Sequence, residues 1–374
     1  MKVMTILGTR PEIIRLSLVI KLLDEFAEEH ILVHTGQNFD DRLSKIFFEQ
    51  LQVREPDYHM NVRGAGFSDQ IGQILTQSEA CFRKFKPDRL LILGDTNSGL
   101  SAIVARRMGI PVYHMEAGNR CFDDRVPEEV NRRVIDHSSS ILMPYTHNSK
   151  ENLMREGIAQ DRLYVTGNPI FEVLEAFTPQ INASEAMKTY GVEKGKFFLV
   201  TLHRSENVDH EGRLKNFLEG LKRLHKAYGF PIIGSLHPRT RDKIAAFGID
   251  PKAYGITFVE PLSFFDFVNL EKNAFCLLSD SGTVQEEGCI FGVPNVTIRD
   301  VTERPETVEC GSNILTGAEP EGIERAVKMV TRVAGGWNPP VEYLAPKVSE
   351  TVGRIVLSYR LPDHAELLYR QSKN

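Results

Sequence analysis

The chain has 374 residues, of which 41% are hydrophobic and 25% are charged, and its formal net charge is −5. This length and composition allow two globular domains, each with a core of its own. The acidic balance argues against a general nucleic-acid binder, since phosphate backbones demand a strongly basic surface. Apolar runs are short and interrupted by charge, which argues against a membrane-spanning segment.

The N-terminal stretch "MKVMTILGTRPE" has one lysine and few apolar residues. It is too short for a signal peptide and predicts a first buried strand instead. The cysteines are odd in number, scattered and never spaced CxxC, a pattern that predicts reduced thiols in a cytoplasmic protein and no metal site. They are Cys81, Cys121, Cys276, Cys289 and Cys310.

Short apolar segments alternate with amphipathic segments along the first half of the chain. Strands that are apolar on both faces are typical of parallel sheets covered by helices on both sides, so this alternation predicts a doubly wound α/β domain. The predicted strands are residues 2–7, 30–35, 89–94, 110–115 and 140–145.

The same alternation restarts in the second half, after a polar, turn-rich stretch at 178–196 that predicts a domain boundary near 168–180. The sequence thus predicts an α/β protein of two doubly wound Rossmann-like domains, residues 1–170 and 171–359, with a C-terminal helix over 360–374 packing back on the first. The predicted strands of this half are residues 197–202, 230–236, 256–259, 274–279 and 293–298.

Polar residues follow these strands where open α/β sheets bind ligands, beyond the carboxyl ends of the strands. Their distribution over both domains predicts a cleft between the domains lined by acids and histidines. Because loops after strands are polar in any α/β protein, the pattern alone leaves ordinary loops as an equal alternative. The residues are Arg10, Asp95, Glu116, His203, His237 and the pair Ser281 and Gly282.

The stretch "DSGTVQEE" reads as a small-residue turn leading into a helix. Backbone N–H groups at a helix N-terminus bind phosphate, and small residues let it approach. An ordinary helix with Ser281 as its N-cap is the alternative. Arg299 and Arg304 follow downstream and can pair with a diphosphate, as can Arg10 in "GTRPE".

In "PEEVNRR", Pro127 opens a predicted helix. Glu128 with Arg132, and Glu129 with Arg133, are i,i+4 pairs of the stabilising orientation. Neighbouring side chains on a helix point about 100° apart, so at most one of the two glutamates faces a given site. A solvated, ion-paired position is the interpretation favoured for Glu129.

The sequence lacks the standard dinucleotide, P-loop and zinc deaminase motifs. "GAGFSD" has aspartate at the third glycine position of a dinucleotide fingerprint and predicts a loop that caps the next helix. A GxxxxGK[ST] loop is lacking, and the "HME" triplet is not followed by the PCxxC of zinc deaminases.

In this order, the motifs closely resemble the non-hydrolysing UDP-N-acetylglucosamine 2-epimerase family. The resemblance covers nearly the whole chain and implies the two-domain fold also seen in GT-B glycosyltransferases. It implies a UDP-N-acetyl sugar as substrate in the inter-domain cleft, no nicotinamide or other cofactor, and usually a homodimer. The matching stretches are "GTRPEII", "HTGQN", "GDTNS", "HMEAG", "PEEVNRR", "TGNP", "LHRSEN", "DSGTVQEE" and "TERPE".

The resemblance implies roles for individual residues. His203 matches the catalytic histidine, Arg15 stands where epimerases of UDP-N-acetylglucosamine commonly have lysine, and Phe267 matches an aromatic near the uracil. Glu287 is expected to contact the ribose hydroxyls. The catalytic carboxylates match Asp95, Glu116 and Glu128. The expected contacts to the nucleotide diphosphate and substrate are Arg10, Arg15, His237, Phe267, Ser281, Gly282, Glu287 and Arg304.

The chain also departs from the mainstream pattern. It reads "HMEAGNRCFDDRVPEE" where those enzymes read "HVEAGLR" and have a longer, Trp-containing stretch, and "GQNFDDRL" where they carry a second histidine lining an activator site. These differences resemble the capsule and O-antigen branch, which makes UDP-N-acetyl-L-fucosamine from the L-talo epimer. The alternatives are an epimerase of UDP-N-acetylglucosamine giving UDP-N-acetylmannosamine, a GT-B glycosyltransferase and a non-catalytic sugar-nucleotide sensor.

The chemistry of an acetamido sugar constrains the mechanism. Its C2 hydrogen is not acidic, because no carbonyl is adjacent, so an enzyme must either oxidise C3 or expel UDP from C1. The chain has no credible dinucleotide fingerprint but has residues suited to stabilising a departing diphosphate. Anti elimination of UDP to a 2-acetamidoglycal, followed by re-addition, is therefore the predicted mechanism, as the resemblance also implies.

Overall fold

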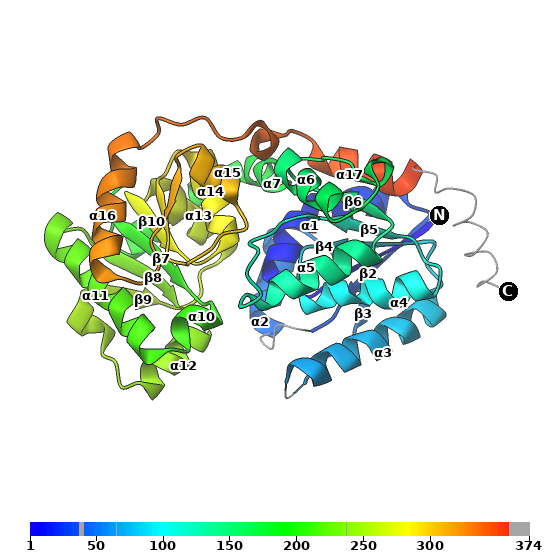
Figure 1. The fold of residues 1–374 in the computed structure, drawn as a ribbon, viewed down its shortest axis with the longest axis horizontal. Helices are drawn as coiled ribbons and strands as arrows, with labels where there is room; N and C mark the ends of the chain where they lie inside the picture. The colour runs from blue at the N-terminus through cyan, green and yellow to red at the C-terminus, as the bar shows by residue number, and fades with distance from the viewer. Residues whose placement is uncertain (37–40, 65, 237, 359–374) are drawn as a thin grey trace. The chain divides into compact units, whose positions relative to one another are not determined.

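The computed structural model describes most of the chain, and Figure 1 shows it as a ribbon. The described residues are 1–36, 41–64, 66–236 and 238–358. None of the helices in these ranges has the length and apolarity needed to cross a bilayer. The chain divides into two compact units, Met1–Glu175 with the chain from Glu342 onward, and Ala176–Val341.

The described part of the first unit contains a six-stranded parallel sheet in the order β3-β2-β1-β4-β5-β6. Its strands are β1 (Lys2–Leu7), β2 (Glu29–His34), β3 (Tyr58–His59), β4 (Arg89–Leu93), β5 (Val112–Met115) and β6 (Ile141–Met143). Its longer helices are α1 (Arg10–Phe26), α2 (Asp41–Gln50), α3 (Phe67–Phe85), α4 (Ser101–Arg107), α5 (Pro127–Ser138), α6 (His147–Arg155), α7 (Ile170–Ala176, which runs into the second unit) and α17 (Val348–Ser358).

The second unit repeats this architecture over its described residues, with the parallel order β12-β11-β10-β7-β8-β9. Its strands are β7 (Phe198–Leu202), β8 (Ile232–Leu236), β9 (Ile256–Val259), β10 (Cys276–Ser279), β11 (Asn295–Thr297) and β12 (Asn313–Leu315). Its helices are α8 (Thr178–Ala183), α9 (Ala186–Thr189), α10 (Ser205–Val208), α11 (Glu211–Tyr228), α12 (Pro238–Ala246), α13 (Phe264–Asn273), α14 (Gly282–Phe291), α15 (Pro305–Glu309) and α16 (Pro320–Val330).

Strands β7 to β10 of the second sheet contribute to two cores because successive side chains point to opposite faces. Phe198 and Val200 pack with α11 and α16 on one face, whereas Phe197 and Leu199 pack with α13 and α14 on the other. Helices accordingly flank both faces of the sheet in Figure 1. This is why the sequence shows nearly continuous apolar runs rather than alternation.

The strand order in both sheets reverses direction at one point, between β1 and β4 in the first and between β7 and β10 in the second. Ligands of doubly wound folds bind at such switch points, outside the carboxyl ends of the strands. The loops after β1 and β4, and after β7 and β10, therefore occupy the positions where each unit is expected to bind a ligand.

The structure confirms every predicted strand to within a few residues and adds two that the sequence did not predict, β3 and β12. The stretch 178–196, read as polar and turn-rich, contains the short helices α8 and α9. Residues from 342 to 358, assigned to the second domain from the sequence, belong to the first unit. The predicted helix over 360–374 lies outside the described residues.

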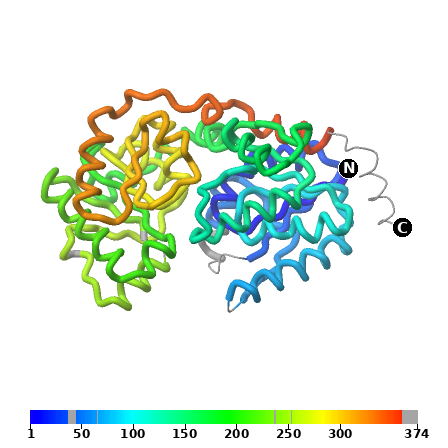
Figure 2. Tube along the Cα trace, viewed as in Figure 1, coloured from blue at the N-terminus to red at the C-terminus, as the bar shows by residue number. Residues whose placement is uncertain are grey.

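The return to the first unit has a clear physical cause, and Figure 2 traces it along the chain. Helix α17 buries Val348, Val352 and Val356 and packs on α1. A Cβ atom at Gly353 would lie 2.2 Å from Leu22 of α1, so the two helices approach closely only because residue 353 has no side chain.

Candidate active site

Glu116 follows β5 directly, and its carboxylate is held on both oxygens. Arg15 of α1 forms an ion pair through Nη1 with Glu116 Oε2, and Asn119 donates from Nδ2 to Oε1 at 3.2 Å. The backbone of Glu116 has φ +63°, a left-handed conformation that non-glycine residues adopt rarely and that clusters at functional sites. The fold thus holds a buried carboxylate in one orientation, which is what a catalytic acid or base requires.

Asp95 follows β4, the strand beside β5, so Asp95 and Glu116 leave adjacent strand ends. Arg132 of α5 donates to Asp95 Oδ2 from Nε at 2.9 Å, and its Nη2 forms an ion pair with the same oxygen at 2.7 Å. The same guanidinium donates from Nη1 to Glu129 Oε2 at 2.7 Å. Arg132 therefore links the predicted catalytic aspartate to the start of α5, where Glu128 lies half-buried at the second position.

Glu129 is fully buried, which corrects the prediction of a solvated position. Its Oε2 accepts the backbone N–H of Cys121 at 3.0 Å, and its Oε1 accepts that of Phe122 at 3.1 Å. Burial alone would raise the pKa of Glu129, but these hydrogen bonds and Arg132 hold that pKa below its usual range. The predicted ion pair between Glu129 and Arg133 is present, at 3.3 Å, but the predicted exposure to solvent is not. Glu129 instead anchors the loop that follows Glu116.

A second buried carboxylate, Asp136, fixes the other end of this loop. It lies 2.9 Å from His114 Nδ1 and accepts from Arg120 Nη2 at 2.7 Å and from the backbone N–H of Gly118 at 3.2 Å. Burial opposes ionisation, but His114 and Arg120 hold the pKa of Asp136 below its usual range. His114 of the "HME" triplet thus acts in structural support of the loop.

Glu12 was not singled out from the sequence. It is 1% exposed and accepts hydrogen bonds from Gly8 N at 3.1 Å, Thr9 Oγ1 at 2.7 Å and Thr96 Oγ1 at 3.2 Å. Burial raises its pKa to about 7, which these hydrogen bonds only partly oppose. The pattern Thr9-x-x-Glu12 before an apolar helix is a capping-box signature and was the available signal. Glu12 ties the loop after β1 to the loop after β4.

In the second unit, His203 follows β7 and Asp280 follows β10, on either side of the switch point. His203 Nδ1 lies 2.9 Å from Asp280 Oδ1. The sequence predicted His203 and the residues after Asp280 but gave Asp280 no role. Adjacent positions beyond neighbouring strands were the signal that could have paired them.

The start of α14 has the features expected of an anion site. Ser281 is the N-cap, and its hydroxyl contacts Thr283 Oγ1 at 2.8 Å without capping the helix. A Cβ atom at Gly282 would lie 2.9 Å from Glu303 Oε1 and 3.6 Å from Arg304 Nη2. The Arg304 guanidinium, which is paired with Glu286, therefore lies beside the helix N-terminus together with the Glu303 carboxylate. Backbone N–H groups at a helix N-terminus favour an anion.

Glu287 of α14 is buried against Glu271 of α13. Burial, together with the neighbouring Glu287 carboxylate, raises the pKa of Glu271 well above its usual range. Phe267, also on α13, is partly buried against the core on that face. Arg299, considered with Arg304 as a diphosphate partner, is enclosed and donates to Glu303 at 2.9 Å.

The structure divides the predicted site residues between the two units. His237 lies outside the described residues. In the ranges that the structure covers, no group of three or more His, Cys, Asp or Glu residues is arranged to hold a metal ion. The first unit contains Arg10, Arg15, Asp95, Glu116 and Glu128, and the second contains His203, Phe267, Ser281, Gly282, Glu287 and Arg304.

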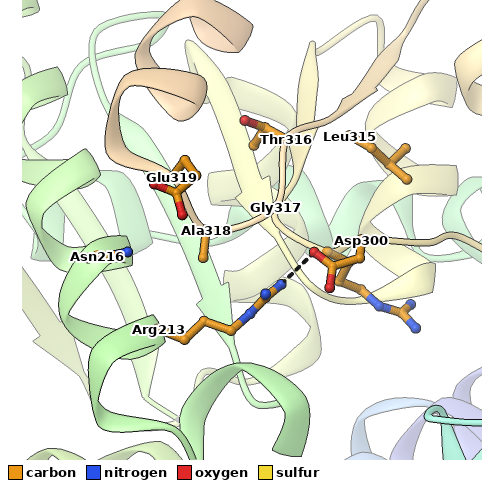
Figure 3. Close-up of a pocket in the computed structure, with 9 residues that line it drawn as sticks. Arg213, Asn216, Asp300, Leu315, Thr316, Gly317, Ala318 and Glu319 are labelled. Atoms are coloured by element: carbon orange, nitrogen blue, oxygen red, sulfur yellow. Dashed lines mark hydrogen bonds and ion pairs between the residues drawn. The ribbon is translucent and has the colours of Figure 1, made fainter.

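A pocket of about 600 Å³ opens in the second unit beyond β11 and β12, and Figure 3 shows its lining. Asp300 accepts from Arg213 Nη2 at 2.9 Å across it. Arg299, considered from the sequence as a diphosphate partner, is one of its lining residues. The lining consists of Arg213, Asn216, Arg299, Asp300, Leu315, Thr316, Gly317, Ala318 and Glu319.

Two doubly wound units with six-stranded parallel sheets define the GT-B-like fold class. Residues 21–356 match the family described as UDP-N-acetylglucosamine 2-epimerase. The UDP-N-acetylglucosamine 2-epimerase of Methanocaldococcus jannaschii is 42% identical over 91% of this chain and 95% of that protein. The UDP-2,3-diacetamido-2,3-dideoxy-D-glucuronate 2-epimerase of Pseudomonas aeruginosa is 37% identical over 88% of this chain and 92% of that protein.

Solved structures with a fold similar to this chain include enzymes of the same name as the sequence relatives. The crystal structure of the M. jannaschii enzyme in complex with UDP-GlcNAc and UDP has a TM-score of 0.90 and 41% identity, covering 95% of this chain and 99% of that chain. The chain belongs to the UDP-N-acetylglucosamine 2-epimerase family and is an isomerase. The predicted family and GT-B-like fold class are thereby confirmed, whereas the predicted branch is not.

Proposed function

We propose that this protein catalyses the non-hydrolysing epimerisation of UDP-N-acetylglucosamine at C2, giving UDP-N-acetylmannosamine. The observation that carries this proposal is the pair of carboxylates at adjacent strand ends, the half-buried Asp95 and the buried Glu116, in a chain of this family. Relatives named UDP-N-acetylglucosamine 2-epimerase support this substrate better than the L-talo sugar that the sequence first predicts.

The mechanism we propose is elimination and re-addition. A carboxylate of the first unit removes the C2 proton as UDP departs from C1, and a proton returns on the opposite face when UDP adds back. Asp95, Glu116 and Glu128 are the proposed acid–base groups. Arg10, Arg304 and the Ser281–Gly282 turn are proposed to stabilise the departing diphosphate.

Nucleotide recognition is proposed to rest on the second unit. Phe267, on α13, is assigned to the uracil and Glu287, on α14, to the ribose hydroxyls, as the family resemblance implies. His203 is the proposed catalytic histidine. A homodimer and a cytoplasmic location, implied by the resemblance and the cysteine pattern, stay predictions that light scattering and fractionation can test.

A second substrate class has a specific observation in its favour. The loop 119–126 differs from the mainstream pattern, and Asn119 within it bonds directly to Glu116. The relative from P. aeruginosa is named for a different 2-acetamido sugar, which supports variation in substrate among chains of this similarity. The UDP-linked 6-deoxy-L sugar therefore remains the rival substrate.

The test is an NMR assay of purified protein with single UDP-sugars and no acceptor or cofactor. We expect UDP-N-acetylglucosamine to equilibrate with its C2 epimer, with a higher kcat/KM than for the 6-deoxy-L sugar. A higher value for the 6-deoxy-L sugar would assign the other branch. Release of UDP only with an acceptor would indicate a glycosyltransferase, free sugar with UDP a hydrolase, and binding without turnover a sensor.

A further inference from the structure

Two cysteines that are distant in the sequence meet in the second unit. Cys289 lies on α14 and is fully buried, whereas Cys310 follows α15 and is partly exposed. Their Sγ atoms are 3.6 Å apart, and both residues are free thiols in this structure. Because α14 and α15 contact each other, the fold itself brings together two sulfurs that are 21 positions apart in the chain.

The two thiols differ in their surroundings. A hydrogen bond from the Cys289 thiol holds the pKa of Cys310 below its usual range, although burial opposes this shift. The same contact, together with burial, raises the pKa of Cys289. The thiolate is the reactive form of cysteine. The partly exposed Cys310 is therefore the sulfur that an oxidant reaches and reacts with first, and Cys289 is the partner that resolves the product.

The other cysteines have environments that do not favour a thiolate. Burial raises the pKa of Cys81 to about 11 and that of Cys276 above its usual range. The Cys121 thiol donates to the Glu129 carboxylate at 3.4 Å. An oxidant is therefore expected to act at the sulfur pair before it acts at these three positions.

We propose that Cys289 and Cys310 form a redox modification site, which a peroxide converts into a disulfide between α14 and α15. The Cys310 thiolate attacks one oxygen of hydrogen peroxide, so an S–O bond forms, the O–O bond breaks, and hydroxide leaves and takes up a proton. Cys289 then loses its proton and attacks the Cys310 sulfur. The S–S bond forms as the S–O bond breaks, and the sulfenic oxygen leaves as water. Two thiols lose two electrons and two protons, and one peroxide becomes two waters.

The disulfide is placed to act on the anion site, because both helices carry parts of it. Helix α14 begins at Gly282, and Arg304 is the N-cap of α15. A disulfide bond is about 2.0 Å long, so the sulfurs have to approach by about 1.6 Å from their present 3.6 Å. Close-packed interiors transmit such a displacement. We expect the oxidised protein to bind UDP more weakly, an effect that rests on the proposed function.

Peptide mapping of the unmodified protein under non-reducing conditions tests the site itself. After treatment with hydrogen peroxide, we expect one pair of peptides joined through Cys289 and Cys310. The pair should be lighter than the two free peptides by two hydrogens, and dithiothreitol should separate it. Two intact thiols, a sulfinic or sulfonic acid at Cys310 beside a free Cys289, or a linkage through another cysteine would each overturn the proposal.

The single tryptophan of the chain is a second readout. Trp337 donates from Nε1 to the backbone carbonyl oxygen of Cys289 at 3.0 Å. Peroxide should therefore change the tryptophan fluorescence, and dithiothreitol should reverse the change. Cys310→Ser should show neither the linkage nor this change, whereas the matched control Cys81→Ala should show both. An equal reversible change in Cys310→Ser would contradict the assignment of the site.

Calorimetry with UDP tests the coupling to the anion site. The oxidised protein should bind UDP at least about 5-fold more weakly than the reduced protein, the lower end of coupling between distinct sites. Peroxide should leave the UDP affinity of Cys310→Ser unchanged. Equal affinities of the reduced and disulfide-containing proteins would refute the coupling. If neither form binds UDP, the proposed function fails, while the disulfide found by peptide mapping stands.

Discussion

At the scale of single residues, the first unit combines groups proposed for chemistry with groups that hold them. Asp95 and Glu116 each have an arginine partner, Arg132 and Arg15 respectively. Sequence reasoning predicted both acids because they follow apolar strands. It could not predict the arginine partners, because their pairing depends on how α1 and α5 pack on the sheet.

Replacing the three proposed carboxylates one at a time tests their role. Asp95→Asn, Glu116→Gln and Glu128→Gln should each lower kcat by about 10²–10⁴-fold, as expected when a positioned acid or base is lost. UDP affinity, measured by calorimetry, should change little because the diphosphate contacts are proposed elsewhere. A variant that loses UDP affinity in proportion to kcat would argue against this division of roles.

Glu129→Gln is expected to be harmful, although the sequence predicts a mild effect. Glu129 accepts from two loop N–H groups and from Arg132, which itself holds Asp95. Losing charge-assisted hydrogen bonds of about 1.5–3 kcal/mol corresponds to a decrease of roughly 10- to 100-fold in kcat if the whole cost falls on the site. The control is Arg133→Gln, whose side chain is 40% exposed and should tolerate the change. Equal activities for the two variants would refute the anchoring role.

Glu12 should make the free energy of unfolding depend on pH. The pKa of Glu12 in the folded protein is about 7, above its ordinary value. At any pH between these two pKa values, folding therefore takes up a proton. The stabilisation is fully present below the ordinary pKa and is lost as pH rises through about 7. The raised pKa changes the free energy of unfolding by about 3 kcal/mol across this pH range, at about 1.4 kcal/mol per pKa unit.

Denaturant titrations of the unmodified protein and of Glu12→Gln between pH 4 and pH 8 measure this effect. The stability of the unmodified protein relative to the variant should decrease over that range, because glutamine does not ionise. Parallel pH profiles would show that Glu12 does not titrate as described.

At the scale of elements, the loop after β5 depends on a glycine as well as on carboxylates. Gly118 has φ +81°, and a Cβ atom there would lie 2.2 Å from the carbonyl oxygen of Ser149 and 2.8 Å from Leu153 Cγ, both in α6. The loop can therefore approach α6 only when residue 118 lacks a side chain.

Gly118→Ala and Gly157→Ala form a matched pair for this contact. Both glycines have positive φ, but a Cβ atom at Gly157 would meet nothing within 4 Å. Gly157→Ala should cost about 1–2 kcal/mol for the left-handed backbone. Gly118→Ala should cost a further 1–3 kcal/mol or so for overpacking, and should lower kcat as well. Equal unfolding free energies for the two variants would contradict the close approach to α6.

Some elements of the structure could not be predicted from local sequence patterns. Strands β3 and β12 have two and three residues, and neither lies in a longer apolar run like those around β6 and β11. Helix α17 buries Val348, Val352 and Val356, but its own sequence does not show that it packs on α1. Local patterns predict which elements exist, whereas the unit to which a late helix returns depends on contacts far apart in the chain.

At the scale of the whole molecule, both units use the same strand order, so each presents its functional loops at a switch point. The first presents acids and the second an anion site with the His203–Asp280 pair. The sequence predicts the fold class from its alternation of apolar strands and amphipathic helices. It singles out Asp95, Glu116 and His203 because they follow strands. The supporting roles of Glu12, Glu129 and Asp280 were not predicted, because the signals at Glu12 and Asp280 did not show which hydrogen-bond donors fold against these carboxylates.

The central claim, C2 epimerisation through elimination of UDP, is tested most directly by isotope exchange. Purified protein is incubated with UDP-N-acetylglucosamine in D₂O without added cofactor, and the products are followed by NMR and mass spectrometry. We predict UDP-N-acetylmannosamine carrying deuterium at C2, with some 2-acetamidoglycal and free UDP after long incubation. Epimer formed without deuterium at C2, or formed only when NAD is supplied, would contradict the mechanism.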